Sequence, residues 1–373
     1  MRGRWRSVRR AFALGALLGL FLVPLFAVFA QQEPTRPTVR PPEEAELFEA
    51  EKRNPPVNVA PQPSASDVWR RIRVGEFGDV PIPDPLAGQL IQSEGEYWRT
   101  VREGPYRFYA GWFLVLVVAL LAVFFALRGR IRVESGFSGI RIRRFGFFER
   151  FVHWLTAISF VLLALTGLNM IYGREWVLPL IGPGAFAGLT FYGKLVHNYL
   201  AFGFMLGVAL MFLQWVWYNL PNRYDIQWML RGGGIFGGGH PPAKKFNAGQ
   251  KVIFWLVVLG GFSLSLSGLQ LLFPYQFSFF ADTFAVFNAW FGTELPTELA
   301  PIQEQQLALI WHGVAAVFMI GVILAHIYIG TLGMEGAFDA MWKGEVDLNW
   351  AREHHNLWVE ELEAKGTVAQ PAE

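Results

Sequence analysis

Residues 306 to 332 read QLALIWHGVAAVFMIGVILAHIYIGTL, an apolar stretch that carries His312 and His326. A helix over this stretch is long enough to cross a membrane, which takes about 20 residues. The two histidines are fourteen residues apart. At about 100° and 1.5 Å per residue, this spacing places both imidazoles on nearly the same helix face, roughly 21 Å apart in depth. We therefore expect this helix to present one ligand near each surface of the membrane.

Ionisable side chains inside membrane helices are rare, and they usually face the interior of the bundle and serve a function. Two histidines on one face strengthen that interpretation. The alternative is that each histidine is a core residue hydrogen-bonded to a neighbouring helix. Histidines at matching depths on other membrane helices would decide between these two interpretations.

The composition predicts a polytopic membrane protein, because 53% of the 373 residues are hydrophobic and only 17% are charged. Nothing in it indicates nucleic-acid binding. The chain has no cysteine, which excludes a thiolate-ligated iron–sulfur cluster, a covalently attached CxxCH haem and a disulfide on this chain. A redox metal held by this chain would therefore depend on histidine.

The first 107 residues predict export of a polar segment. Residues 1–30 combine a basic start with an apolar run and small residues, as in a signal peptide, with an uncleaved anchor as the alternative. Residues 31–107 are rich in Pro, Glu and Arg and lack sustained periodicity, so we expect a largely extended segment outside the membrane. It would serve as a tether, a docking strip for a partner or a passive linker.

Five apolar segments follow that are long enough to cross a membrane as helices, at residues 109–127, 151–172, 195–220, 252–273 and 307–332. Positive charge gathers in alternate loops, which the positive-inside rule places in the cytoplasm together with the tail after residue 333. The N-terminal segment would then lie outside, in agreement with the signal-like start. The loop residues are Arg128, Arg130, Arg132, Arg141, Arg143, Arg144, Arg150, Arg223, Arg231, Lys244, Lys245 and Lys251.

Two further histidines match the first two in depth. His153 stands at the cytoplasmic start of the second span and His197 at the outer start of the third. Depth pairs His153 with His326 and His197 with His312, the arrangement that two bis-histidine b-type haems require. Zinc is the competing metal, but a closed zinc site wants four ligands, and no cysteine or nearby carboxylate completes one.

The neighbouring residues leave alternatives open. Arg150 and Lys194 each precede a proposed ligand by three residues, so they would pair with haem propionates or simply anchor the helices at the interface. Gly167 would make room for a flat macrocycle, or serve ordinary helix packing. His240 is expected to be a loop residue. His354 and His355 are expected to be a solvated pair in a polar tail, with proton supply or subunit docking as the alternative.

Taken together, these motifs resemble the cytochrome b (gamma) subunit of membrane-bound formate dehydrogenase. The resemblance covers roughly residues 140–365. It is carried by FERFVHW at 148–154, His197, NAGQK at 247–251, the spacing of His312 and His326, and the tail REHHNLWVEELEAK at 352–365. Cytochrome b subunits of nickel–iron hydrogenases and other quinone-linked periplasmic oxidoreductases are similar in outline and remain alternatives, as does a haem-free transporter or scaffold.

The resemblance implies an all-α membrane protein, a four-helix dihaem cytochrome b bundle (139–335) with one extra N-terminal transmembrane helix and its loop (108–138). A cytoplasmic tail (336–373) completes the chain. Electrons would come from an iron–sulfur (beta) subunit, itself fed by the catalytic (alpha) subunit that oxidises formate. They would pass through the two b haems to quinone in the bacterial inner membrane. By the same resemblance, Asn247, Gly249 and His326 would line the quinone pocket.

Overall fold

The computed structural model describes residue 73 and residues 98–234 and 239–367. The expected signal peptide and residues 31–72 and 74–97 of the outer segment lie outside the described residues. Within the described part, five helices are long and apolar enough to cross a membrane. They are α5 (Arg107–Arg128), α6 (Phe147–Trp176), α7 (Leu178–Trp215), α9 (Ala248–Leu272) and α11 (Pro301–Tyr328). The prediction of five spans is confirmed.

The first membrane helix begins earlier than the sequence pattern predicted. It starts at Trp98, eleven residues before Tyr109, so the expectation of extended chain is wrong for residues 98–107. Pro105 in this stretch reads as a helix breaker, but it lies in a π-helical turn, η1 (Arg102–Tyr106). Such a wide turn can accommodate a local interruption of the α-helical hydrogen bonds. An Arg107–Glu103 ion pair of 2.8 Å, four residues apart, supports the same turn.

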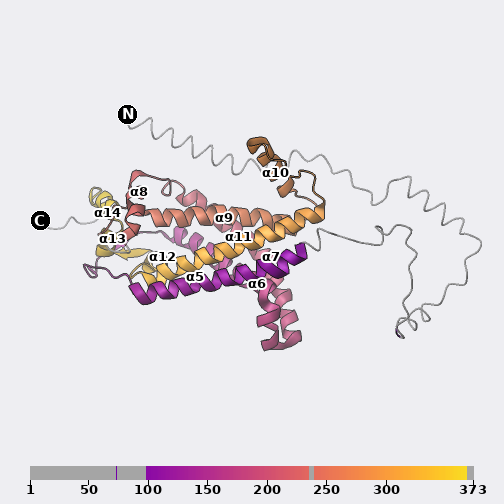
Figure 1. Cartoon of the computed structure of the whole chain (residues 1–373). Helices are drawn as coiled ribbons and strands as arrows, with labels where there is room; N and C mark the ends of the chain where they lie inside the picture. Colours follow the sequence, from indigo (N-terminus) through magenta and orange to yellow (C-terminus); the bar gives the residue numbers. More distant parts are fainter. Residues whose placement is uncertain (1–72, 74–97, 235–238, 368–373) are drawn as a thin grey trace, which may run out of the picture. The chain divides into compact units, whose positions relative to one another are not determined.

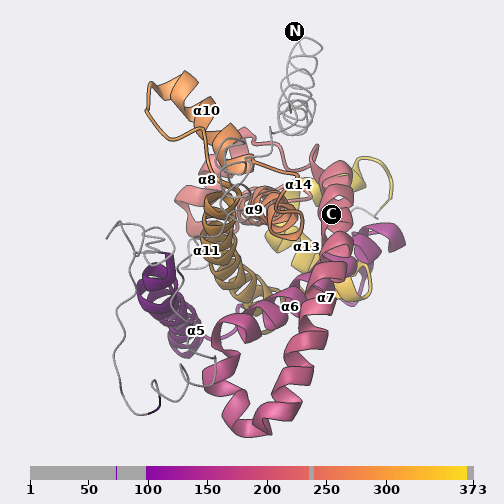
Figure 2. The same ribbon diagram turned by 90° about the vertical axis from the view of Figure 1, so that its right-hand side faces the viewer.

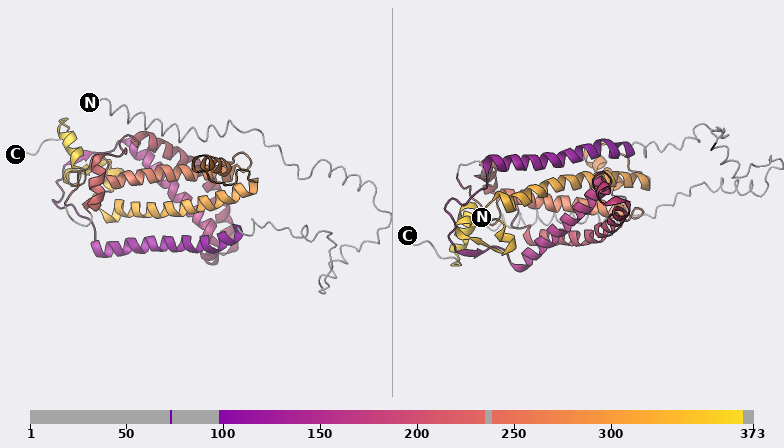
Figure 3. Two further views of the ribbon diagram at one scale, coloured as in Figure 1. Left: turned by 45° about the horizontal axis from the view of Figure 1, so that its top comes forward. Right: turned by 90° about the horizontal axis from the view of Figure 1, so that it is seen from below.

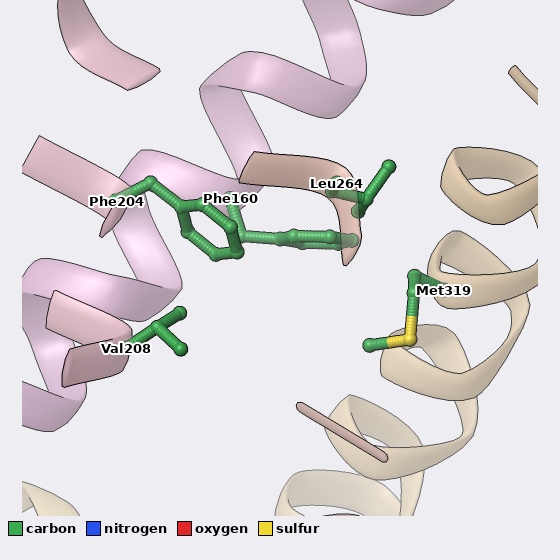
Figure 4. Packing of buried hydrophobic residues seen from close by; sticks show 5 residues of the cluster. All are labelled: Phe160, Phe204, Val208, Leu264 and Met319. Carbon is green, nitrogen blue, oxygen red and sulfur yellow. The ribbon is translucent and has the colours of Figure 1, made fainter. Parts of the chain in front are cut away.

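The long helices run side by side (Figures 1 and 3). α6 packs mainly on α7, and α9 packs on both α7 and α11. Between the two levels of histidines lies a cluster of buried apolar side chains contributed by four helices (Figure 4): Phe160, Phe204, Val208, Leu264 and Met319. Met319 is seven residues from each histidine of α11, so this core occupies the middle of the bundle.

The additional helix α5 is fixed to the bundle through α11, beside which it lies in Figure 2. Gly321 of α11 allows the close approach, because a Cβ there would lie 2.7 Å from the ring of Phe113. At the start of α5, the hydroxyl of Tyr172 in α6 donates a hydrogen bond of 2.8 Å to the carbonyl of Arg107. Near its other end, the ring of Phe124 lies 6.2 Å from that of Tyr328 in α11. Helix α5 is therefore packed against the bundle along much of its length.

The polar residues beyond the membrane fold back onto the bundle. Strand β1 (Arg141–Arg143) pairs antiparallel with β2 (Glu345–Asp347), with Ile142 opposite Val346. The carboxylate of Glu353 accepts hydrogen bonds from the backbone of Glu134 and Ser135. The remaining elements are α8 (Arg223–Leu230), η2 (Gly232–Gly234), α10 (Phe279–Phe291), η3 (Ile329–Gly333), α12 (Asp339–Trp342), α13 (Leu348–His354) and α14 (Asn356–Glu363).

Candidate functional site

The structure brings the four membrane histidines together as two pairs. His153 of α6 faces His326 of α11 with ring centroids 6.3 Å apart, and His197 of α7 faces His312 of α11, also at 6.3 Å. The ring planes are inclined by 59° and 63°. These are the pairs that helix depth predicted, and α11 contributes one member to each.

The spacing of each pair fits a single metal ion held between two imidazoles. A metal–nitrogen bond of roughly 2 Å, plus about 1 Å from the nitrogen to the ring centre, gives a centroid separation of about 6 Å. Among the described residues, no group of three or more His, Cys, Asp or Glu side chains could hold a metal. The donor sets therefore fit haem iron, whose macrocycle supplies the other ligands, better than they fit zinc.

Hydroxyl groups orient the rings of the His197–His312 pair. Thr166 Oγ1 lies 2.8 Å from His197 Nδ1, and Ser267 Oγ lies 2.9 Å from His312 Nδ1. Each hydroxyl donates its own proton to a backbone carbonyl of its helix, that of Leu162 or Ser263, and so accepts a hydrogen bond from the imidazole. Both Nε2 lone pairs then remain free for a metal. Fixing the tautomer and orientation of ligand rings in this way is the usual role of the residues that surround a metal's ligands.

The His153–His326 pair has a different environment. His153 Nδ1 is buried and has no hydrogen-bond partner among the described residues. The next residue, Trp154, donates from its indole to the carbonyl of Met341 at 3.0 Å, which fixes the start of α6 against the segment after α11. Here the backbone of the tail, rather than a hydroxyl on a membrane helix, holds the ligand region in place.

Glycines lie beside both imidazoles of the His197–His312 pair. A Cβ at Gly167 would lie 3.6 Å from His197 Cε1, and one at Gly268 would lie 3.5 Å from His312 Cε1. Gly167, fourteen residues after His153, thus lies at the level of the His197–His312 pair. Gly268 was not singled out from the sequence.

The two predicted propionate partners lie in different surroundings. Arg150 donates from Nη1 to the carbonyl of Trp342 at 2.7 Å, so one edge of its guanidinium already binds the tail. Its Nε is buried without a partner among the described residues. Lys194 is exposed, in keeping with a position at the membrane interface.

The NAGQK segment begins α9, and Asn247 caps the helix. Its side-chain oxygen accepts from the backbone N–H of Gln250 at 2.9 Å, and the side chain of Gln250 accepts in return from the N–H of Asn247 at 3.1 Å. The side-chain oxygen of Asn247 therefore serves as the helix cap, and its amide NH₂ remains as a donor. Gly249 is close to a residue that the sequence did not indicate, since a Cβ there would lie 2.8 Å from the indole of Trp228.

The expectation that His354 and His355 form a solvated pair is wrong. His355 is completely buried, and its Nδ1–H donates to the carbonyl of Lys244 at 2.7 Å. The tail folds back against the loop, and this encloses the ring between Trp350 and Trp358. Burial holds the pKa of His355 well below its usual value. His240 lies in a loop, as predicted.

Comparison with known proteins identifies relatives of one kind. Residues 144–344 match the family described as prokaryotic cytochrome b561. The chain is 29% identical to the nitrate-inducible formate dehydrogenase cytochrome b556(Fdn) subunit of Escherichia coli K12, over 60% of this chain and 92% of the relative. It is 30% identical to the cytochrome b556(fdo) subunit of formate dehydrogenase from the same strain (57% and 90%). It is also 24% identical to the formate dehydrogenase cytochrome b556 subunit of Haemophilus influenzae (57% and 79%).

Proposed function

Because this chain belongs to the prokaryotic cytochrome b561 family, as the cytochrome b subunit of a formate dehydrogenase, we propose that it carries two b haems, one between each histidine pair. The protein is a multi-pass membrane subunit that associates with other subunits of that enzyme and transfers electrons through b haem to quinone. Formate oxidation itself takes place on another subunit. The number of haems, their ligands and the quinone site are the parts that we propose.

The observation that carries the two-haem proposal is the equal spacing of 6.3 Å in both histidine pairs. His153 and His326 would hold the inner haem iron, and His197 and His312 the outer one. Each bound haem supplies a one-electron carrier. The chain's own contribution is to orient the imidazoles, through Thr166 and Ser267 at the outer level, and to exclude water from the apolar core between the two levels.

We place the quinone site at the start of α9, with Asn247, Gly249 and the inner ligand His326 as its lining. The amide NH₂ of Asn247 offers a donor for a quinone carbonyl. Gly249 permits close approach, although Trp228 already occupies part of that space. Arg150 and Lys194 are proposed as partners of the haem propionates, Arg150 through its unpartnered Nε.

The proposed orientation places the tail, the inner pair and the NAGQK segment on the cytoplasmic side. An iron–sulfur (beta) subunit, itself supplied by the catalytic (alpha) subunit, would deliver electrons at the opposite face. Residues 1–30 and 31–97 would then be the signal peptide and a periplasmic segment. The first membrane helix with its loop (98–138), the bundle (139–335) and the tail (336–373) complete the proposed domain plan.

Rapid mixing of the purified complex tests this function. Formate should reduce all the b haem of the complex, and a quinone analogue added afterwards should reoxidise it. The electron route is contradicted if formate reduces the haem but quinone leaves it reduced, or if quinone is reduced while the haem stays oxidised.

A further inference from the structure

Five buried nitrogen atoms without protein partners gather beneath the folded tail. They are Arg144 Nε and Nη1, Trp350 Nε1, His354 Nε2 and His355 Nε2, and none has a hydrogen-bond partner among the described residues. Buried polar groups in folded proteins are nearly always paired, with protein or with ordered water. We call Arg144, Trp350, His354, His355 and Trp358 the tail cluster.

The side chains of the tail cluster contact one another closely. The guanidinium of Arg144 lies over the rings of Trp350 and Trp358, at 5.2 and 5.4 Å from their centroids. The ring of Trp350 is 5.1 Å from that of His354 and 5.4 Å from that of His355. Arg144 is buried, forms no ion pair with a carboxylate within the described part of the chain, and has a pKa lowered to about 9 by burial.

The two histidines can accept protons. In His355 the Nδ1–H is engaged by the carbonyl of Lys244, so Nε2 carries the lone pair of a neutral imidazole. His354 is only partly buried as a residue, yet its Nε2 is fully buried. Its ring therefore reaches from the surface into the cluster, a geometry suited to passing protons between water and a buried site.

Titratable groups connect the cluster with solvent. The ring of His354 is 6.0 Å from that of His240, and His240 Nε2 lies 3.3 Å from the carboxylate of Glu134, whose side chain is 77% exposed. The other charged groups that face the histidines are Arg144 and Glu353.

At its inner end the cluster meets the NAGQK segment. Arg144 Nη2 donates to the carbonyl of Lys245 at 2.7 Å and lies 3.4 Å from the side-chain oxygen of Gln250. Gln250 is the reciprocal capping partner of Asn247. The side chain of Gln250 alone therefore separates Arg144 of the tail cluster from Asn247, the residue that we place at the quinone.

We propose that the tail cluster is the proton-uptake path of the quinone site, with His354 as the shuttle from the surface and His355 as the buried acceptor; this rests on the proposed function. A quinone that takes two electrons from the haems also takes two protons, one on each carbonyl oxygen, and leaves as the quinol. The protons come from water on the tail side, through Glu134 and His240. Arg144 keeps its proton and positions the path against Gln250.

Two variants of the complete complex test the path. His355→Asn retains a donor at the position of Nδ1 for the Lys244 carbonyl but lacks Nε2, and His354→Gln removes the shuttle ring. Glu361→Gln is the matched control, because Glu361 is exposed on α14 and pairs with Lys244 outside the cluster. The assay follows reoxidation of formate-reduced haem by a soluble quinone analogue between pH 6 and 9.

We expect both histidine variants to retain their haem and its reduction by formate, while quinone reduction slows by about a hundredfold at neutral pH, the lower end of proton-transfer effects. The loss should grow as pH rises, because free protons become scarce, and added imidazole should restore the rate. The proposal would be overturned if both histidine variants reduced quinone as fast as the Glu361→Gln control at every pH. It would also be overturned if their rates fell equally at every pH and added imidazole did not restore them. If the unaltered complex fails to reduce quinone, the proposed function fails instead.

Discussion

The imidazole rings of His153 and His326 face each other between α6 and α11, with their centroids 6.3 Å apart. The same separation recurs between α7 and α11, at the other histidine of α11. Helix α11 therefore serves both levels, with Met319 of the apolar core midway between its two histidines. Displacing α11 should disturb both levels together, whereas changing one histidine should disturb one.

The substitution Asn247→Asp separates the cap from the quinone contact. Aspartate caps a helix as well as asparagine does, but it lacks the amide donor and adds a negative charge. We expect both haems and the folded complex to persist while quinone reduction slows at least tenfold, about 1.4 kcal/mol in barrier. Asn247→Ser, which also caps and adds no charge, should share most of the loss. Normal quinone turnover in both variants, at unchanged haem content, would remove Asn247 from the site.

The orientation can be tested by labelling, because the chain has no cysteine of its own. Single cysteines at the exposed positions Glu298, before α11, and Lys365, in the tail, should differ in intact cells. A membrane-impermeant maleimide that reaches the periplasm should label Glu298→Cys and leave Lys365→Cys unlabelled until the cells are broken. The reverse pattern would show that the tail lies outside.

Acid should release the tail from the bundle. Burial lowers the pKa of His354 to about 4 and holds that of His355 well below its usual value. The released tail therefore binds more protons than the packed tail as pH falls from about 6.5 toward 4, and the packed state loses stability over that window. The pKa of Glu353 is also lowered, by the hydrogen bonds that its carboxylate accepts from Ser135 and Glu134. The stability that this carboxylate gives to the packed tail is therefore lost only at still lower pH.

Limited proteolysis between pH 7 and pH 4.5 measures this release. Cleavage within the tail should become faster as the pH falls, and His355→Asn should weaken the dependence. Equal cleavage at both pH values would show that the histidines do not control the packing of the tail.

The length of the apolar runs was sufficient to predict the spans, and the depth of each histidine within its span was sufficient to predict the histidine pairs. Spacing along one helix does not reveal which side chains meet across helices. For that reason Thr166, Ser267 and Trp228 were missed, although each contacts a predicted residue.

The tail misled the sequence interpretation for a related reason. Its charged residues suggested a solvated segment, whereas β2 pairs with β1, about 200 residues earlier in the chain, and Glu353 binds the loop that follows α5. This long-range pairing buries His355, and a local sequence pattern such as REHH does not predict pairing over that distance. The start of the first membrane helix was missed because residues 98–107 carry charged side chains, among them Arg102, Glu103 and Arg107, and so lie outside the apolar run.

The measurement that tests the account most directly is the haem b content per chain, with optical spectra, of the purified complex and of four single variants: His153→Ala, His326→Ala, His197→Ala and His312→Ala. The unaltered complex should hold two b haems per chain. His197→Ala and His312→Ala should each lose the same one of two spectral components, and His153→Ala and His326→Ala should each lose the other. One haem per chain in the unaltered complex, or loss of the same component in His153→Ala and His197→Ala, would contradict the two-haem assignment.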